Sequence, residues 1–256
     1  MTNINYRSGA IDPSSCVGDA WELVKRNIGM YIGVALVSLL MISCIPIANM
    51  FLIGPVMGGF AYIVLRDMRN EPVDFGMMFK GFEKFVPLML VGLIQSIPGI
   101  IFQILQLTVD IGRLMTNQRN DDLQFFQISQ TDIASGAWIM IAIFALVFAL
   151  IAMIWNVALM FAIPLTVEND IGVGEAIKLS FGAAFHNVGG LIVLVLFSIL
   201  ITLVGIFALC FGLLVAIPVV WAANTFAYRQ VFPLMDERYN MTPPPAAYGT
   251  NFGVGQ

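Results

Sequence analysis

The chain has 256 residues, of which 59% are hydrophobic and only 11% charged, and its formal net charge is −4. Soluble domains carry about a quarter charged residues, so this composition excludes an ordinary water-soluble fold. It predicts an all-α, polytopic transmembrane helical bundle. A negative chain without a basic stripe also argues against nucleic acid as a partner. The three cysteines are scattered, which indicates neither a disulfide framework nor a metal site.

Four stretches without Asp, Glu, Lys or Arg each exceed the roughly 20 residues that a helix needs to cross a bilayer. They are 27–65, 85–109, 133–167 and 187–228. The first and last are about twice that length, so we expect each to form a helical hairpin. Pro46 and Asn49 predict the turn of the first hairpin, and Gly205 and Gly212 bracket the bend of the last.

Single crossings are predicted near 86–107 and 136–164, which gives about six membrane segments in total. The hairpin arms are at the short end of the spanning range. Hairpins that dip into the membrane and return to the same side are therefore the alternative.

A short amphipathic segment precedes three of the membrane segments, and we expect all three to lie along the membrane surface. In 12–28, Asp12 is the expected N-cap with Pro13 at the first helical position. Its predicted apolar face consists of Val17, Ala20, Trp21, Val24 and Ile28. The second segment opens at Asp74 and places on one face Phe75, Met78, Phe79 and Phe82. The third, 174–187, has a weaker face of Ala176, Ile177, Ser180, Phe181 and Ala184.

We predict one membrane domain over 1–238 and a disordered, Pro- and Gly-rich tail over 239–256. Within the domain, 12–69 and 170–232 are repeat-like halves around a middle pair, 85–167, which contains a polar insert at 108–135. Ile53-Gly54-Pro55 matches Ala216-Ile217-Pro218, and Phe60-Ala61-Tyr62 matches Phe226-Ala227-Tyr228. Chance alignment of apolar sequence is the alternative explanation.

The distribution of basic residues predicts the orientation of the chain. Ten of the twelve Lys and Arg residues fall on the side of the termini, whereas the insert holds only Arg113 and Arg119. Cytoplasmic segments carry an excess of Lys and Arg, so both termini are expected in the cytoplasm.

The sequence offers little for catalysis, so we expect a protein that is not an enzyme and needs no cofactor. His186 is the only histidine, and it is expected at the membrane boundary with its polar edge in water. Neither a phosphate-binding loop nor a nucleophile elbow occurs. The acidic pairs Asp121-Asp122 and Glu168/Asp170 are interpreted as solvated loop charges.

Five neutral amides within the apolar stretches are the candidate residues for ligand binding or helix packing: Asn49, Asn156, Asn224, Gln95 and Gln103. Amides in membranes most often form hydrogen bonds between helices, and the sequence favours that structural role over a solute site. Since ionisable side chains are absent from these stretches, a proton-coupled pump is not expected.

Small residues and prolines give weaker indications. Gly29–Gly33 and Gly54–Gly58 have the G-x-x-x-G spacing that lets helices approach closely, within one chain or between copies, which leaves a homo-oligomer open. Helix kinks are expected at four prolines: Pro55, Pro98, Pro164 and Pro218.

Several short motifs carry a family resemblance: Ala20-Trp21-Glu22-Leu23, Asn27-Ile28-Gly29, Gly54-Pro55 with Gly58-Gly59, Phe79-Lys80-Gly81-Phe82, Phe85-Val86-Pro87-Leu88 and Phe226-Ala227-Tyr228. Over about 17–232 the chain resembles a broad group of uncharacterised bacterial multi-pass inner-membrane proteins. More distantly, it resembles the membrane domain found beside glycerophosphodiester phosphodiesterases. The resemblance implies a helical protein of the bacterial inner membrane, and it carries no catalytic residue because no catalytic domain is attached.

Three functions are compatible with these features. The leading hypothesis is a non-enzymatic membrane protein that acts through membrane lipids or a small amphipathic ligand held between the repeats. A transporter or channel is the second, and a water-lined cavity at Asn49, Asn156 and Asn224 would favour it. The third is a scaffold or accessory subunit with a membrane-protein partner, which stable co-purification would favour.

Overall fold

The computed structural model describes residues 4–43, 49–115, 137–208 and 211–233. Within these ranges the chain is helical and contains no strand, so the predicted all-α bundle is confirmed. The membrane-segment helices are α2 (Ile28–Ser43), α3 (Asn49–Met68), α4 (Phe85–Gln95), α5 (Ile97–Met115), α7 (Ala137–Ala158), α8 (Ala162–Glu168), α10 (Val188–Phe207) and α11 (Phe211–Val231). The short helices that precede them are α1 (Pro13–Arg26), the 3-10 helix η1 (Phe75–Phe82) and α9 (Val173–Phe185).

Four helical stretches are long and apolar enough to cross a bilayer: Asn49–Met68, Ile139–Glu168, Val188–Phe207 and Gly212–Val231. The number rises to six if each of two bent pairs is one span, namely α1 with α2, bent by 101°, and α4 with α5, bent by 58°. The predicted number of about six is the upper end of this range. The chain is a helical membrane protein.

Both expected hairpins are present as adjacent, packed helices, α2 with α3 and α10 with α11. Their turns fall on 44–48 and 209–210, outside the described residues. Helix α5 continues to Met115 and so includes the beginning of the insert predicted at 108–135. The remainder of the insert, with Asp121-Asp122, and the tail at 239–256 lie outside the described ranges.

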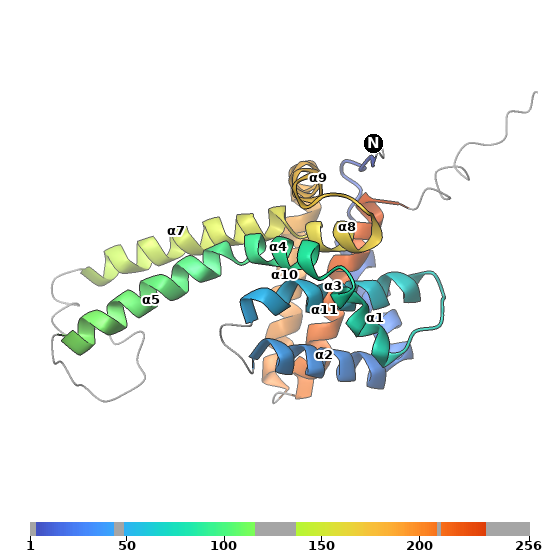
Figure 1. Cartoon of the computed structure of the whole chain (residues 1–256), viewed down its shortest axis with the longest axis horizontal. Coiled ribbons are helices and arrows are strands. Elements are labelled where there is room, and N and C mark those ends of the chain that lie inside the picture. Colours follow the sequence, from blue (N-terminus) through green and yellow to red (C-terminus); the bar gives the residue numbers. More distant parts are fainter. Residues whose placement is uncertain (1–3, 44–48, 116–136, 209–210, 234–256) are drawn as a thin grey trace, which may run out of the picture.

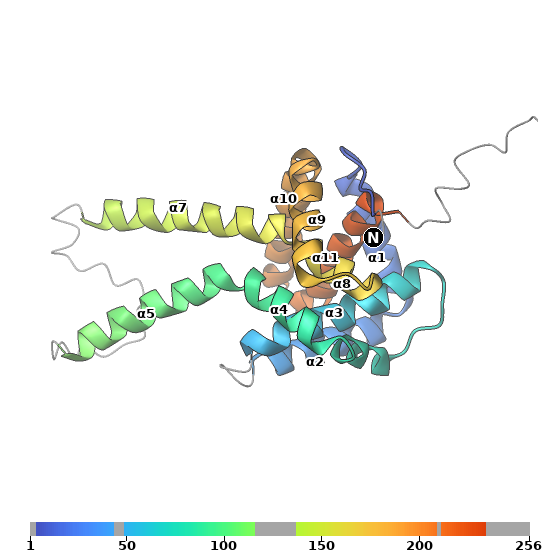
Figure 2. The same ribbon diagram turned by 45° about the horizontal axis from the view of Figure 1, so that its top comes forward.

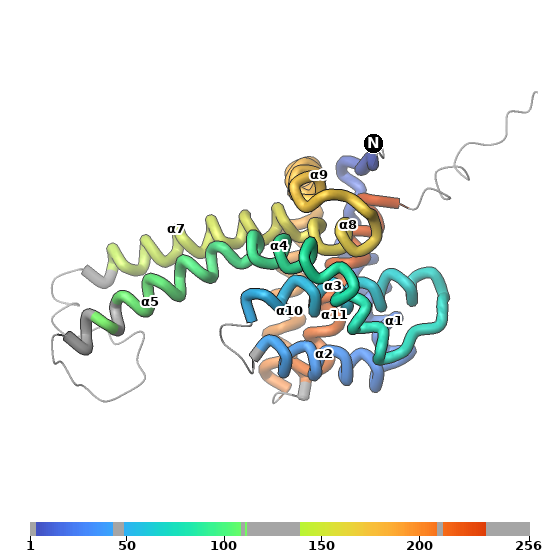
Figure 3. The backbone as a smooth tube through the Cα atoms, viewed as in Figure 1, coloured from blue at the N-terminus to red at the C-terminus, as the bar shows by residue number. Residues whose placement is uncertain are grey.

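The short helices connect three units of the chain, each of which contacts the other two. Figures 1 and 3 show these helices along the chain. Unit one is α1–α3, unit two runs from η1 to α8, and unit three is α9–α11. Each short helix packs mainly on the unit before its own: η1 on α3 and α2, α9 on α8, α7 and α4, and α1 on α11 and α10. The last of these contacts joins α1 to the final two helices, α10 and α11.

Hydrogen bonds from the N-terminal segment reinforce this contact. The backbone N–H of Arg7 donates to the carbonyl of Val231 over 2.9 Å. The buried side chain of Asn187 donates to the carbonyl of Arg7 and accepts from the N–H of Ala10, both over 2.9 Å. These hydrogen bonds therefore hold the non-helical N-terminal segment against unit three.

Helices α5 and α7 extend away from the rest of the bundle (Figure 2). Most of the apolar side chains described on these two helices are exposed, including Ile104, Leu107 and Phe144, each with about 60% of its surface accessible. The rings of Phe102 and Phe148 stack between the two helices at 6.2 Å. Apolar surface on this scale is energetically favourable only in contact with lipid or another apolar partner.

Helix α1 begins as predicted. The carboxylate of Asp12 accepts hydrogen bonds from the backbone N–H groups of Ser14 and Ser15, and Pro13 occupies the first helical position. Its predicted face is right for Ala20 and Val24, which are buried. Trp21 and Ile28 are 44% and 42% exposed, and Ile28 belongs to α2 and not to α1. Cys16 and Leu23, which were not part of the predicted face, are buried as well. The buried face of α1 is therefore rotated relative to the predicted one.

The predicted single face of the second short segment is also wrong. Because η1 is a 3-10 helix with three residues per turn, Phe75, Met78 and Gly81 lie in line. Met78 and Gly81 are buried against α3, whereas Phe79 is 48% exposed and belongs to the outer side with Phe82. The predicted four-residue apolar face is thus divided between the core and the surface.

The face predicted for α9 is confirmed, with Ala176, Ser180 and Ala184 buried. Ser180 also has a structural role that its position on an apolar face did not suggest. Its hydroxyl donates to the carbonyl of Ala158 over 2.8 Å and accepts from the N–H of Phe161 over 3.2 Å. These bonds satisfy backbone groups left open at the break between α7 and α8.

Charged side chains at the ends of the three units form connected ion pairs. Arg229 of α11 contacts both carboxylate oxygens of Glu168 at the end of α8, over 2.6 and 3.2 Å, and Arg69 lies 3.8 Å from the same carboxylate. The side chain of Glu168 is only 18% exposed, so its interpretation as a solvated loop charge is wrong. Asp170 is 92% exposed and pairs with Lys84.

These contacts predict a loss of stability in acid. Hydrogen bonding by Arg69 holds the pKa of Glu71 below its ordinary value of 4.5, and Lys84 does the same for Asp170 below 3.8. A lowered folded-state pKa stabilises the fold above the unfolded pKa, and that contribution is lost as pH falls through the folded value. The melting temperature is expected to be constant from pH 7 to about 5 and to fall below about 4.5. The Glu71→Gln variant should show a shallower decline, and an identical decline would exclude Glu71 as a contributor.

Candidate functional site

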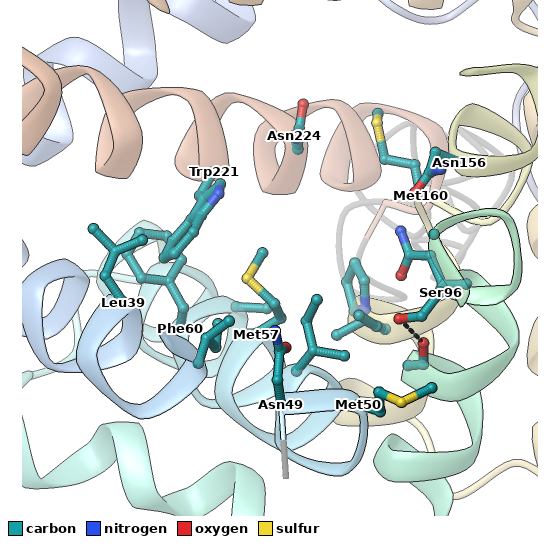
Figure 4. Close-up of a pocket in the computed structure, with 18 of the residues that line it drawn as sticks. Leu39, Asn49, Met50, Met57, Phe60, Ser96, Asn156, Met160, Trp221 and Asn224 are labelled. Atoms are coloured by element: carbon teal, nitrogen blue, oxygen red, sulfur yellow. Dashed lines mark hydrogen bonds between the residues drawn. The ribbon is translucent and has the colours of Figure 1, made fainter. Parts of the chain in front are cut away.

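The three units surround a cavity of about 560 Å³ (Figure 4). Its walls come from α2, α3, α4, α5, α7, α8 and α11, and from the residues between α7 and α8. Most of the lining is apolar, and three of its 21 residues are methionines: Met50, Met57 and Met160. Thioether side chains adapt their shape readily, which suits a cavity that encloses a flexible apolar molecule.

All five amides predicted as candidate residues line this one cavity. Asn49 opens α3, Gln95 ends α4, Gln103 lies on α5, Asn156 on α7 and Asn224 on α11. They therefore come from all three units, although up to 175 positions separate them in the chain. Figure 4 shows Asn156 beside Met160 at one side of the cavity and Asn49 at another.

The hydrogen bonding of these amides differs from the structural role that the sequence favours. Among the described residues, the side chains of Asn49, Gln95, Gln103 and Asn224 form no hydrogen bond with the protein. The amide of Asn156 donates only to the carbonyl of Ala152 in its own helix, over 2.9 Å. Within the described part of the chain, therefore, none of the five side chains bonds another helix, and four of them keep their donors and acceptors available at the cavity wall.

A bend between α4 and α5 brings several polar groups to the cavity wall. Pro98 has no N–H with which to bond the carbonyl of Ile94, four residues earlier. The indole Nε1–H of Trp155 supplies that bond from α7, over 2.9 Å. The bend thus places Gln95 and Ser96 at the wall, where the Ser96 hydroxyl donates to the carbonyl of Gly92 over 2.7 Å. The kink predicted at Pro98 lies within two residues of the observed 58° bend.

Aromatic side chains close the cavity toward the charged end of the bundle. Trp221 of α11 meets Phe60 of α3 edge to face, with ring centroids 5.1 Å apart, and both line the cavity (Figure 4). Phe60 in turn contacts the fully buried Tyr31 at 6.1 Å. The aromatic wall of the cavity therefore continues into the core of the bundle.

A second cavity, of about 470 Å³, adjoins the first. Gln95, Asn156, Met160 and Asn224 line both. The remaining walls of the second are side chains of α7, α10 and α11: Met153, Val157, Val195, Ser198, Ile199, Thr202, Leu203 and Val220. The lining of the two cavities contains no Asp, Glu, Lys, Arg or His.

His186 lies away from both cavities, at the end of α9. Its Nδ1 is 2.7 Å from the carbonyl of Gly182 and 3.3 Å from the hydroxyl of Tyr6. These contacts attach the N-terminal segment to unit three. Over the described ranges, no group of three or more His, Cys, Asp or Glu side chains is arranged to hold a metal ion.

The sequence did not identify Ser96, Phe60 or Trp221 as cavity residues. Phe60 and Trp221 are ordinary apolar residues in an apolar stretch, so no local pattern distinguishes them. Pro98, two residues after Ser96, was the only available signal for a bend there.

No protein-family model matches the chain, and no curated protein or solved structure resembles it significantly.

Proposed function

We propose that the chain is a non-enzymatic membrane protein that binds a lipid or another small amphipathic molecule in the cavity between its three units. The observation that carries this proposal is the convergence of five amides from three units on one largely apolar cavity, where none of them bonds another helix of the described chain. Unsatisfied polar groups inside a membrane protein cost free energy unless water or a ligand meets them. The polar part of an amphipathic ligand would form hydrogen bonds with the amides, and its apolar part would pack against the methionines.

The cavity also supports a second proposal, that the chain is a transporter which moves such a ligand. Asn49 of unit one and Asn224 of unit three both line the central cavity. Alternating access between two repeats is expected to have such a site between them. Transport toward the charged end requires Phe60 and Trp221 to separate. Binding requires no such movement, so binding is the simpler of the two proposals.

The proposal also covers the orientation of the chain in the membrane and the origin of its repeats. We place the chain in the inner membrane of a bacterium with both termini in the cytoplasm, on the basis of ten Lys and Arg residues on that side. We propose that units one and three arose by duplication. Pro55 in α3 and Pro218 in α11 are both internal prolines, and Arg66 and Arg229 occupy the last turns of the same helices.

Native mass spectrometry of the detergent-purified full chain, with lipidomics of whatever stays bound, tests the proposal. The wild type is expected to retain a defined lipid or small molecule, and the Asn49→Ala/Asn224→Ala double variant should lose most of it. Thr108→Ala is the matched control, since the Thr108 hydroxyl bonds only the carbonyl of Ile104 on α5, outside both cavities. Bulk lipid that is unchanged by the double variant would contradict ligand binding and favour the scaffold role.

A further inference from the structure

We infer that the ligand is an uncharged lipid that enters sideways from the bilayer, with its head group at the amides and one acyl chain in the second cavity. This inference rests on the proposed function and makes it specific. It assigns the two adjoining cavities to the two parts of one molecule.

The second cavity suits an alkyl chain because its two hydroxyl groups are already satisfied. The hydroxyl of Ser198 donates to the carbonyl of Leu194 over 2.9 Å, and that of Thr202 to the carbonyl of Ser198 over 2.7 Å. The other wall residues of α7, α10 and α11 in this cavity are aliphatic apart from the shared amides and methionines. Away from those amides, an alkyl chain therefore leaves no polar group without a partner.

The head group belongs where the cavities meet. Gln95, Asn156 and Asn224 line both cavities and offer amide donors and acceptors, while neither lining includes an ionisable side chain. A phosphate monoester or carboxylate would bring a charge into this wall without a counter-ion, which is strongly unfavourable at membrane depth. A hydroxyl or ester head group needs only hydrogen bonds, which the amides supply.

The entrance lies on the lipid side of α10. Ile199 and Leu203 line the second cavity and are nevertheless 49% and 45% exposed, as is Met153 of α7 at 42%. Ile199 lies near the middle of the 20-residue helix α10, so this rim is near mid-depth of the bilayer. A lipid acyl chain reaches that depth without crossing water.

Competition between two lipids that differ only in charge tests the inference. The full-length protein is equilibrated with phosphatidylcholine vesicles that contain equal amounts of dioleoylglycerol and dioleoyl phosphatidic acid, then re-extracted and analysed by native mass spectrometry. We expect dioleoylglycerol to be retained at least about tenfold over phosphatidic acid. Ile199→Trp should reduce retention of dioleoylglycerol at least about fivefold by filling the second cavity.

Leu200→Trp is the matched control, because Leu200 is 56% exposed on the same helix and does not line the cavity. If Ile199→Trp fails to give a monodisperse protein, Leu203→Trp blocks the same rim. Equal retention of both lipids overturns the uncharged head group, and normal retention in the rim variants overturns the lateral chain site. Both results leave ligand binding itself intact, whereas a wild type that retains neither lipid above the phosphatidylcholine background contradicts the proposed function as well.

Discussion

Gly59→Ala is expected to destabilise the folded protein by about 3 kcal/mol or more, because α3 touches the backbone of η1 at this residue. A Cβ at Gly59 of α3 would lie 1.8 Å from the carbonyl oxygen of Met78 in η1. Likewise, a Cβ at Gly81 of η1 would lie 2.0 Å from the carbonyl oxygen of Pro55 in α3. These contacts are between backbone atoms, so no side-chain rotation relieves them. The two helices must separate to admit even one methyl group.

Unfolding of the purified protein by SDS in mixed micelles, followed by tryptophan fluorescence, measures this effect. Gly29→Ala is the matched control, since a Cβ at Gly29 has no atom within 4 Å. That variant should be as stable as the wild type or slightly more so, given the higher helix propensity of alanine. Equal stability of both variants would show that α3 and η1 are not in backbone contact.

The same contacts answer a question that the sequence left open. Of the two G-x-x-x-G spacings, Gly54–Gly58 is used within the chain, where a Cβ at Gly54 would lie 1.9 Å from the carbonyl oxygen of Leu88 in α4. At Gly33 the nearest atoms belong to Phe75 at an ordinary 3.8 Å. The close approach of α3 to α4 therefore packs unit one on unit two.

Glu168→Ala is expected to cost about 3 kcal/mol of stability, because it leaves the nearly buried Arg229 without its counter-ion. The carboxylate contacts Arg229, whose side chain is 14% exposed, and accepts a hydrogen bond from the hydroxyl of Tyr228 over 2.6 Å. Arg69, the residue that follows α3, is 3.8 Å away. The substitution thus affects α3, α8 and α11 together, which belong to three different units.

The thermal stability of Glu168→Ala in detergent should be compared with that of Glu22→Ala. Glu22 also forms an ion pair, with Lys25 at 3.3 Å, but both side chains are more than half exposed. Exposed pairs of this kind contribute about 0 to 1 kcal/mol, so the control is expected to melt close to the wild type. Similar melting temperatures for the two variants would mean that Glu168 is solvated, as the sequence alone had indicated.

Hydropathy and capping signals were sufficient to predict the helices. Asp12 with Pro13 predicted the beginning of α1, and the lengths of the uncharged stretches predicted two hairpins. These signals are local, because backbone hydrogen bonds in a membrane must be satisfied within each helix. They predict elements reliably, but they carry little information about which helices become neighbours.

Which side chain faces which partner depends on packing, and there the sequence was less informative. Helical periodicity placed Trp21 with Ala20 and Val24, although only the last two are buried. The period of η1 was misjudged because it is a 3-10 helix, which packs through Gly81 on the backbone of α3. Both errors arise from neighbours distant in sequence.

The amides illustrate the same limit at the candidate site. Their rarity in apolar stretches identified Asn49, Asn156 and Asn224, but the sequence favoured hydrogen bonds between helices. Whether an amide bonds another helix or faces a cavity depends on the distance between units, and that distance is set by Gly59, Gly81 and the bend at Ser96. No spacing within one stretch encodes it.

The packing of α1 on α11 has a consequence for how the protein is made. Helix α1 is synthesised before α10 and α11, so the surface that buries Cys16, Ala20 and Leu23 is completed only after this hairpin has followed it. Until then, the apolar face of α1 has no partner in unit three. Only a chain that has been synthesised through α11 can therefore bury this face.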